Sequence, residues 1–259
     1  MTLPSLQSLL LASEKDIEQI SDYFDALVKE AVARINRGFS IKRLIKQPRS
    51  IEPLPTEMRQ LSSYRTRIGT MLEYGLSTAI TEILEERYNS LFFFTFATSH
   101  EYPDFYFRDS SLIPLLRLEM KAVDAESDEQ AARFGTPTIW INDEQDLLLL
   151  VAWEWTKITL ENGSLGEYPH IFSSLVVPAG DIARERDIRL EITGGKIEGE
   201  KTLVFSSRSQ QYVADPGNYG KFWRIVHASR IGSPDLHLSI QKFLIFLRSV
   251  DEKAARKRF

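Results

Sequence analysis

The sequence contains no cysteine and only four histidines among its 259 residues. The absence of cysteine excludes disulfide bonds, thiolate zinc sites, iron–sulfur clusters and a cysteine nucleophile. The histidines, His100, His170, His227 and His237, lack the spacing of metal ligands, so each is expected to be a structural or surface residue. A bound metal ion would therefore depend on oxygen ligands or on these few histidines.

Targeting segments and nucleotide-binding motifs are also missing. The apolar run Leu3 to Leu11 has no basic residue before it and acidic residues soon after it, which fits neither a signal peptide nor a membrane span. We therefore expect a cytoplasmic protein. The chain has no Walker A loop, no dinucleotide-binding glycine pattern and no nucleophile elbow, so we expect no nucleotide cofactor.

The composition is that of a globular protein, with 43% apolar and 26% charged residues. The formal net charge of −4 does not indicate a nucleic-acid partner, but such binding depends on where Lys and Arg lie. Two basic clusters could contact phosphates, although each alone is typical of a solvated surface or tail. They are Lys42, Arg43, Lys46 and Arg49, and Lys253, Arg256, Lys257 and Arg258.

The first part of the chain is predicted to be helical. Apolar residues recur at helical spacing over residues 13 to 36, with Ser13 as the expected N-cap and Gly38 as the expected stop. A polar, proline-bearing stretch from Gln47 to Pro55 separates this helix from a second one over residues 61 to 87.

Strands dominate the prediction for the middle of the chain. Leu91 to Ala97, Asp104 to Phe107 and Leu115 to Val123 are expected to be strands, and Ala125 to Phe134 has helical spacing. Leu147 to Trp153 is apolar at every position, as in a strand covered on both faces. Strand, helix, strand in this order predicts a parallel crossover.

The last hundred residues are predicted to be rich in strands, at Ile188 to Ile192, Thr202 to Phe205 and Phe222 to Val226. Gly194-Gly195 is a hairpin signal, and a helix is expected from Asp235 to Val250. The chain thus divides into a helical extension (residues 1–60), a central core (61–160) and a β-rich region with a closing helix (161–259), the last expected to belong to the same domain as the core.

A charged row on the third strand carries the predicted chemistry. Side chains alternate along a strand, so Arg117, Glu119 and Lys121 share one face. Asp104 lies in the adjacent predicted strand, close enough in sequence to stand beside Glu119. Two neighbouring carboxylates repel each other, and Mg²⁺ relieves such repulsion because it prefers oxygen ligands. An ammonium two residues along could orient the attacking water or offset charge on a phosphate.

These residues resemble a known family. Pro103-Asp104 followed by Glu119-Met120-Lys121 is similar to the PD-(D/E)xK nucleases, which include many type II restriction endonucleases, over roughly residues 61 to 155. Arg67-x-Gly69-x-x-x-Glu73 resembles the first core helix of the family. The resemblance implies metal ligands at Asp104 and Glu119, a catalytic lysine at Lys121 and a supporting catalytic carboxylate at Glu73.

The resemblance implies an α/β fold whose core runs helix, three strands, helix, strand, with a mixed central sheet flanked by helices. It implies Mg²⁺-dependent, sequence-specific hydrolysis of double-stranded DNA, with Mn²⁺ able to substitute, and a homodimer on palindromic sites. Two alternatives stay open. One is a repair or recombination nuclease that recognises DNA structure, and the other is a non-catalytic DNA-binding module.

Two further observations bear on this interpretation. Pro234-Asp235 followed by Asp251-Glu252-Lys253 satisfies the same loose motif, but no strand, helix and strand can follow it before the chain ends. A polar segment of the last third offers donors suited to base edges in the major groove. Its candidate DNA-binding residues are Arg208, Gln210, Gln211, Asn218, Lys221 and Arg224.

Overall fold

The computed structural model describes residues 6–12, 14–40, 57–97, 102–125, 132–159, 163, 165–204, 217–226 and 233–258. The helices within this part of the chain are α1 (Leu6–Leu10), α2 (Ile17–Ser40), α3 (Met58–Tyr88), the short 3₁₀ helix η1 (Thr138–Trp140), α4 (Ala179–Ile192), α6 (Phe222–Ile225) and α7 (Leu238–Arg258). The strands are β1 (Phe92–Phe96), β2 (Phe105–Asp109), β3 (Pro114–Asp124), β4 (Asp146–Thr159), β5 (Leu165–Pro178), β6 (Gly195–Glu198) and β7 (Lys201–Val204).

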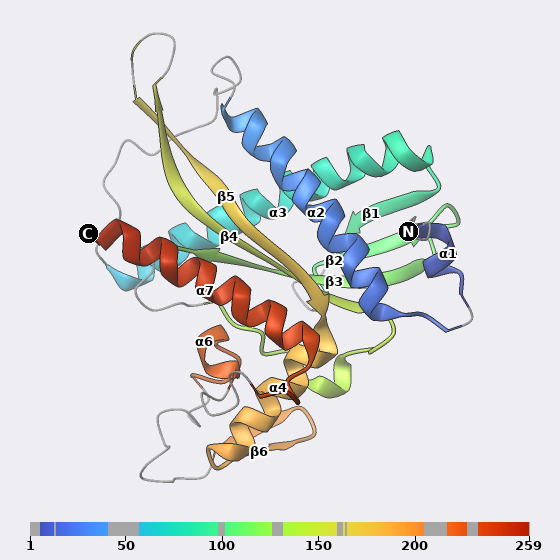
Figure 1. Ribbon diagram of the computed structural model, residues 1–259, viewed down its shortest axis with the longest axis vertical. Coiled ribbons are helices and arrows are strands. Elements are labelled where there is room, and N and C mark those ends of the chain that lie inside the picture. The colour runs from blue at the N-terminus through green and yellow to red at the C-terminus, as the bar shows by residue number, and fades with distance from the viewer. Residues whose placement is uncertain are drawn as a thin grey trace.

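A mixed five-stranded sheet with the order β1-β2-β3-β4-β5 forms the centre of the molecule (Figure 1). β3 and β4 are parallel, as the sequence predicted, and the other neighbours are antiparallel. β6 and β7 form a separate two-stranded sheet. The predicted α/β class with a mixed sheet and flanking helices is therefore confirmed at this level.

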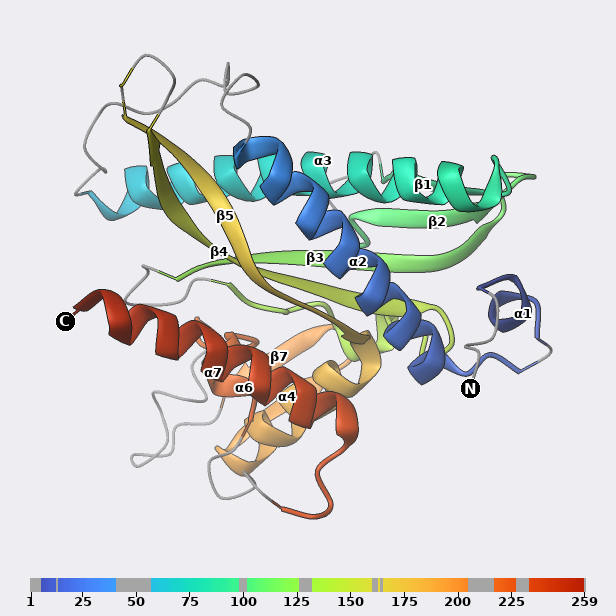
Figure 2. The same ribbon diagram turned by 45° about the horizontal axis from the view of Figure 1, so that its top comes forward.

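Helices cover both faces of the sheet (Figure 2). One core contains residues of α1, α2 and α3, and the other contains residues of α4, α6 and α7. β4 contributes to both cores, because Leu147, Leu149 and Val151 face the first and Leu148 and Leu150 face the second. The uninterrupted apolar run of β4 follows from this central position.

The long helices begin and end at identifiable signals, some of which differ from the prediction. α2 starts at Ile17, where the Asp16 side chain accepts a hydrogen bond from the Gln19 backbone N–H at 3.1 Å. Ser13, the predicted N-cap, lies outside the described residues, and Gly38, the predicted stop, lies inside α2. α3 ends at Asn89, which adopts a left-handed conformation and donates its N–H to Glu85.

The prediction was wrong for several elements of the second half. Ile188 to Ile192 belongs to α4. Its alternation of apolar and polar residues also fits a helix, in which Leu190 is buried while Ile188 and Ile192 are exposed. Phe222 to Ile225 is the helix α6, and Gly194-Gly195 joins α4 to β6. The hairpin turn instead follows β6 and uses Gly199, whose φ is +58°.

The region after residue 160 is consequently mixed in structure, since β5 was missed and α4 and α6 were predicted as strands. Thr202 to Val204 of the predicted strand lie in β7, while Phe205 lies outside the described residues, and the closing helix is confirmed, although α7 extends to Arg258. In the predicted crossover helix, residues 126–131 lie outside the described part. Its end is extended, because Arg133 forms an isolated β-bridge with Lys221.

Helix α2 is fixed to the outer edge of β5 by polar side chains. The Asn36 amide donates to the Ile171 carbonyl at 2.7 Å and accepts from the Ile171 N–H at 3.1 Å. Asp25 accepts from the Val176 N–H at 3.0 Å. Since α1 and α2 share one core with α3, the predicted N-terminal extension is an integral part of this α/β unit. Within the described residues, no helix combines the length and apolar character needed to cross a membrane.

Candidate active site

The charged row of β3 exists as the alternation predicted. Leu116, Leu118 and Met120 enter the core under α2 and α3, while Glu119 and Lys121 lie on the opposite face. Lys121 Nζ donates to Glu119 Oε1 at 2.5 Å. The Glu119 side chain is only 9% exposed, so this ion pair is partly removed from water.

Asp104 lies beside Glu119, at the point where β2 and β3 separate. The ladder between these strands ends with the pair Phe105 and Leu118, and Asp104 directly precedes Phe105. Asp104 Oδ2 then accepts a hydrogen bond from the Met120 backbone N–H at 2.8 Å. This bond replaces the next ladder step and holds the Asp104 carboxylate next to that of Glu119.

The electrostatics of Glu119 show how crowded this position is. Burial and the neighbouring Asp104 carboxylate raise the pKa of Glu119, and the Lys121 ammonium opposes that effect. Glu119 Oε2 is buried and has no hydrogen-bond partner among the described residues. A buried oxygen acceptor with no donor, next to a second carboxylate, fits a divalent cation that takes oxygen ligands.

Glu73 of α3 belongs to the same group of charges. Its helix runs close to β3, because a Cβ placed on Gly69 would lie 3.9 Å from the Ala122 Cβ. Burial raises the pKa of Glu73 to about 7, and the carboxylates of Asp104 and Glu119 add to the rise while Lys121 opposes it. The structure thus brings together all four predicted catalytic residues, which come from α3, β3 and the residue before β2.

This arrangement combines three carboxyl groups and one ammonium whose charges act on one another. The excess of negative charge favours a divalent cation held by Asp104 and Glu119. Glu73 can stabilise water ligands or change its protonation near neutral pH. Lys121 can approach a phosphate from the same face. Such a set suits hydrolysis of a phosphodiester by water.

Arg117, the third member of the charged row, has a different role. Its guanidinium donates to both carboxylate oxygens of Asp146, at 2.6 and 2.5 Å, and to the Trp140 carbonyl at 3.0 Å. Asp146 is completely buried at the start of β4. The hydrogen bond with Asp146 raises the pKa of Arg117, so this residue stays charged and paired.

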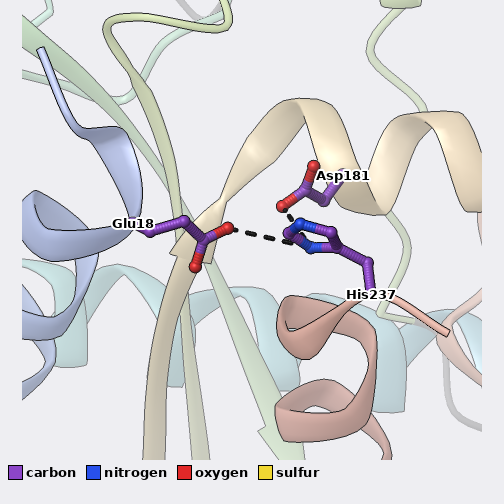
Figure 3. Close-up of side chains that lie close together, drawn as sticks. All are labelled: Glu18, Asp181 and His237. Carbon is purple, nitrogen blue, oxygen red and sulfur yellow. Dashed lines mark ion pairs between the residues drawn. The ribbon is translucent and has the colours of Figure 1, made fainter. Parts of the chain in front are cut away.

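A second carboxylate cluster lies elsewhere and was not predicted (Figure 3). Glu18 of α2, Asp181 of α4 and His237, which precedes α7, direct their side chains toward one another. His237 Nδ1 lies 3.1 Å from Asp181 Oδ2 and 3.7 Å from Glu18 Oε1. The buried Ser239 hydroxyl lies 2.7 Å from Asp181 Oδ2 and 2.9 Å from Glu18 Oε1.

This second cluster has its own sources of compensation. Glu18 and Asp181 lie in the first turns of their helices, where the helix dipole favours a negative charge. Ser239 supplies a donor, and the His237 side chain is 55% exposed. His237 is exposed, as expected of a surface residue, but its ligand atom and those of Glu18 and Asp181 lie within 4.8 Å of one another, a spacing that could hold a metal ion and that the sequence did not predict.

The predicted DNA-binding residues are only partly described. Arg208, Gln210 and Gln211 lie outside the described residues, as do Lys42, Arg43, Lys46 and Arg49. Asn218 is 6% exposed, and a buried amide cannot reach a base edge while the loop keeps this conformation. Lys221 and Arg224 lie at the start and within α6. The structure therefore leaves base recognition as a prediction and argues against Asn218.

Asp251 and Lys253, which belong to the second match to the motif, make contacts with other parts of the fold. Asp251 accepts hydrogen bonds from the Trp223 indole at 3.0 and 3.2 Å, and Lys253 pairs with Glu154 at 2.7 Å. All three residues of this Asp251-Glu252-Lys253 segment lie on α7 rather than on a strand.

Comparison with known protein families finds none that matches the chain, and no curated protein matches it.

Proposed function

We propose that the protein is a Mg²⁺-dependent DNA endonuclease of the PD-(D/E)xK type, with its catalytic centre at Glu73, Asp104, Glu119 and Lys121. One observation carries this proposal. The four side chains come from separate elements, yet burial and neighbouring carboxylates raise the pKa of both Glu73 and Glu119, and one buried Glu119 oxygen has no hydrogen-bond partner among the described residues. A surface pattern that matched the motif by chance would not be expected to converge in this way.

Each residue has a role that follows from its position. Asp104 and Glu119 would hold the cation, which when bound would polarise the scissile phosphate and lower the pKa of a bound water. Lys121 lies on the same strand face, where its ammonium can orient the attacking water or stabilise charge on the phosphate. Glu73, with its raised pKa, can accept a proton near neutral pH.

The order of elements supports the same proposal. α3, β1, β2 and β3 are followed by a connection to β4, which is parallel to β3. This order is compatible with the core implied by the family resemblance, with β5 as an additional strand, although the helix found among the described residues of the connection is the three-residue η1. We further propose a type II restriction enzyme acting as a homodimer, because a palindromic DNA site presents the same half-site twice.

The test is incubation of the purified protein with plasmid and bacteriophage DNA, in Mg²⁺, in Mn²⁺ or with a chelator, alongside Asp104→Ala and Lys121→Ala. Discrete metal-dependent fragments that both variants fail to produce would establish a sequence-specific nuclease. Cutting of branched DNA without defined sites would favour a repair or recombination nuclease. Intact DNA in all conditions, with binding unchanged in Asp104→Ala, would favour the non-catalytic module.

A further inference from the structure

Asp146 accepts hydrogen bonds from Tyr102 and Arg117, each of which stands two residues from a predicted metal ligand. Besides the two bonds from Arg117, its Oδ2 accepts the Tyr102 hydroxyl at 2.5 Å and the Asn142 backbone N–H at 2.9 Å. Asp146 is 0% exposed. A carboxylate buried this deeply is costly unless donors surround it, so the four donors explain how it is tolerated.

The partners of Asp146 connect it to both sides of the candidate site. Tyr102 precedes Asp104 by two residues, and Arg117 precedes Glu119 by two residues on the same face of β3. Asp146 is itself the parallel neighbour of Arg117 across β3 and β4. One carboxylate therefore joins the segment that presents Asp104 to the strand that presents Glu119.

The main chain holds this segment to the end of β1, where the Asp104 carbonyl accepts the Ala97 N–H at 2.9 Å, rather than to β3. The β2–β3 ladder stops at Phe105 and Leu118, so the segment before Phe105 is not held by strand pairing with β3. Asp104 is fixed to β3 by its own side chain, through the Met120 N–H. If the Asp104 carboxylate turned toward a cation, it would release the Met120 N–H and its segment would lose this anchor. A second contact would then keep the segment in place.

The Tyr102 hydroxyl has the properties of that second contact. It donates to Asp146 Oδ2 at 2.5 Å, and Asp146 is also the acceptor for Arg117 of β3. The Arg117 guanidinium also lies 5.4 Å from the centre of the Tyr102 ring, which adds a cation–π contact to the same cluster. The cluster thus holds both the ring and the hydroxyl of Tyr102.

We propose that Asp146, acting through Tyr102 and Arg117, is a positioning residue that sets the separation of the Asp104 and Glu119 carboxylates and thereby the affinity for a divalent cation. This inference rests on the proposed function, because it takes these two carboxylates as the metal ligands. Partners of ligating carboxylates typically change metal affinity by about 10- to 100-fold when removed.

The experiment compares two variants that lose the same kind of bond. Tyr102→Phe removes the hydroxyl that binds Asp146. Tyr219→Phe is the matched control, because its hydroxyl donates to Asp187 at 2.7 Å in contacts with α4 rather than with the site. Mn²⁺ binding to the full chain is measured by calorimetry well below the melting temperature, for the wild type, both variants and Asp104→Asn.

We expect Mn²⁺ to bind Tyr102→Phe about tenfold more weakly and Tyr219→Phe as the wild type does, while both variants melt at slightly lower temperatures. Equal Mn²⁺ affinity in Tyr102→Phe and the wild type would overturn the positioning role alone. Wild-type affinity in Asp104→Asn, or no binding by the wild type, would overturn the metal site and this inference together. Metal binding with the expected pattern but no DNA cleavage would refute the nuclease and leave the inference standing.

Discussion

The molecule contains two carboxylate clusters that differ in what surrounds them. Glu18 and Asp181 lie at helix N-termini, next to the Ser239 hydroxyl and an exposed histidine. Asp104 and Glu119 are presented by strands, which have no comparable dipole, and their nearest cation is Lys121. Both clusters contain a buried glutamate oxygen without a partner among the described residues, so that feature alone does not separate them.

The difference shows how a protein can tolerate carboxylates that lie close together. In the cluster of Glu18, the helix ends and Ser239 offset part of the repulsion, which fits a structural connection between α2, α4 and α7. The cluster of Glu119 contains three carboxyl groups. Their charge is offset by one ammonium, that of Lys121, and by the Met120 N–H. The cluster of Glu119 therefore leaves negative charge that a cation would neutralise, whereas the cluster of Glu18 has more groups that offset its charge.

The largest expected difference comes from the same substitution at each cluster. Glu119→Gln should lower the rate of DNA cleavage on the order of a thousandfold, because the neutral amide loses the charge that holds the cation. Glu18→Gln should cleave as the wild type does. Single-turnover cleavage of plasmid DNA measures both, and equal losses in the two variants would remove the functional distinction between the clusters.

Lys121→Met should slow cleavage by about 100- to 1000-fold while the protein still binds Mn²⁺. The reason is that the ammonium acts on the phosphate or water, whereas its loss frees Glu119 from its ion pair. Cleavage kinetics combined with Mn²⁺ calorimetry separate the two effects. If cleavage fell only because Mn²⁺ binding was lost, Lys121 would be a structural partner of Glu119.

Ser239→Ala should lower the free energy of unfolding by about 1 to 3 kcal/mol without changing cleavage, because it removes the buried donor shared by Glu18 and Asp181. Ser249→Ala is the control on the same helix, since the Ser249 hydroxyl contacts only a carbonyl and another hydroxyl. Urea unfolding measures both. A smaller loss in Ser239→Ala than in Ser249→Ala would contradict this interpretation.

The smallest expected effect concerns pH. The pKa of Glu73 is raised in the folded protein from 4.5 to about 7, so folding binds a proton between these values. The stability due to this proton is present below pH 4.5 and is lost as pH rises through about 7. Allowing for solvent screening, Glu73→Gln should stabilise the metal-free protein by about 1 kcal/mol at pH 8 and by less at pH 5. An equal effect at both pH values, in unfolding experiments with chelator, would contradict the assignment.

Sequence reasoning succeeded where a local pattern determines the structure. The alternation of Leu116, Leu118 and Met120 with Glu119 and Lys121 located β3 and the face that carries the candidate site, because neighbouring strand residues face opposite sides. The apolar run of β4 indicated a central strand for the same reason. Glu73 was selected by its motif, and in the folded protein the carboxylates of Asp104 and Glu119 raise its pKa.

The failures have the opposite cause. Ile188 to Ile192 fits both a strand and a helix, and only packing of Leu190 decides between them. Asp146 and the cluster of Glu18 depend on contacts between segments far apart in sequence, which no local pattern specifies. A single acidic residue directly before the apolar run of β4 was the available sign that Asp146 would be buried, but its partners could not be named from it.

The contacts between α2 and β5 have a consequence for the behaviour of the protein in concentrated solution. β5 is a long strand at the edge of the sheet, and an exposed edge of this kind can pair with another chain and begin aggregation. Asn36 occupies both backbone groups of Ile171, and Asp25 occupies the N–H of Val176. Helix α2 therefore protects the sheet from intermolecular strand addition, in addition to its part in the core.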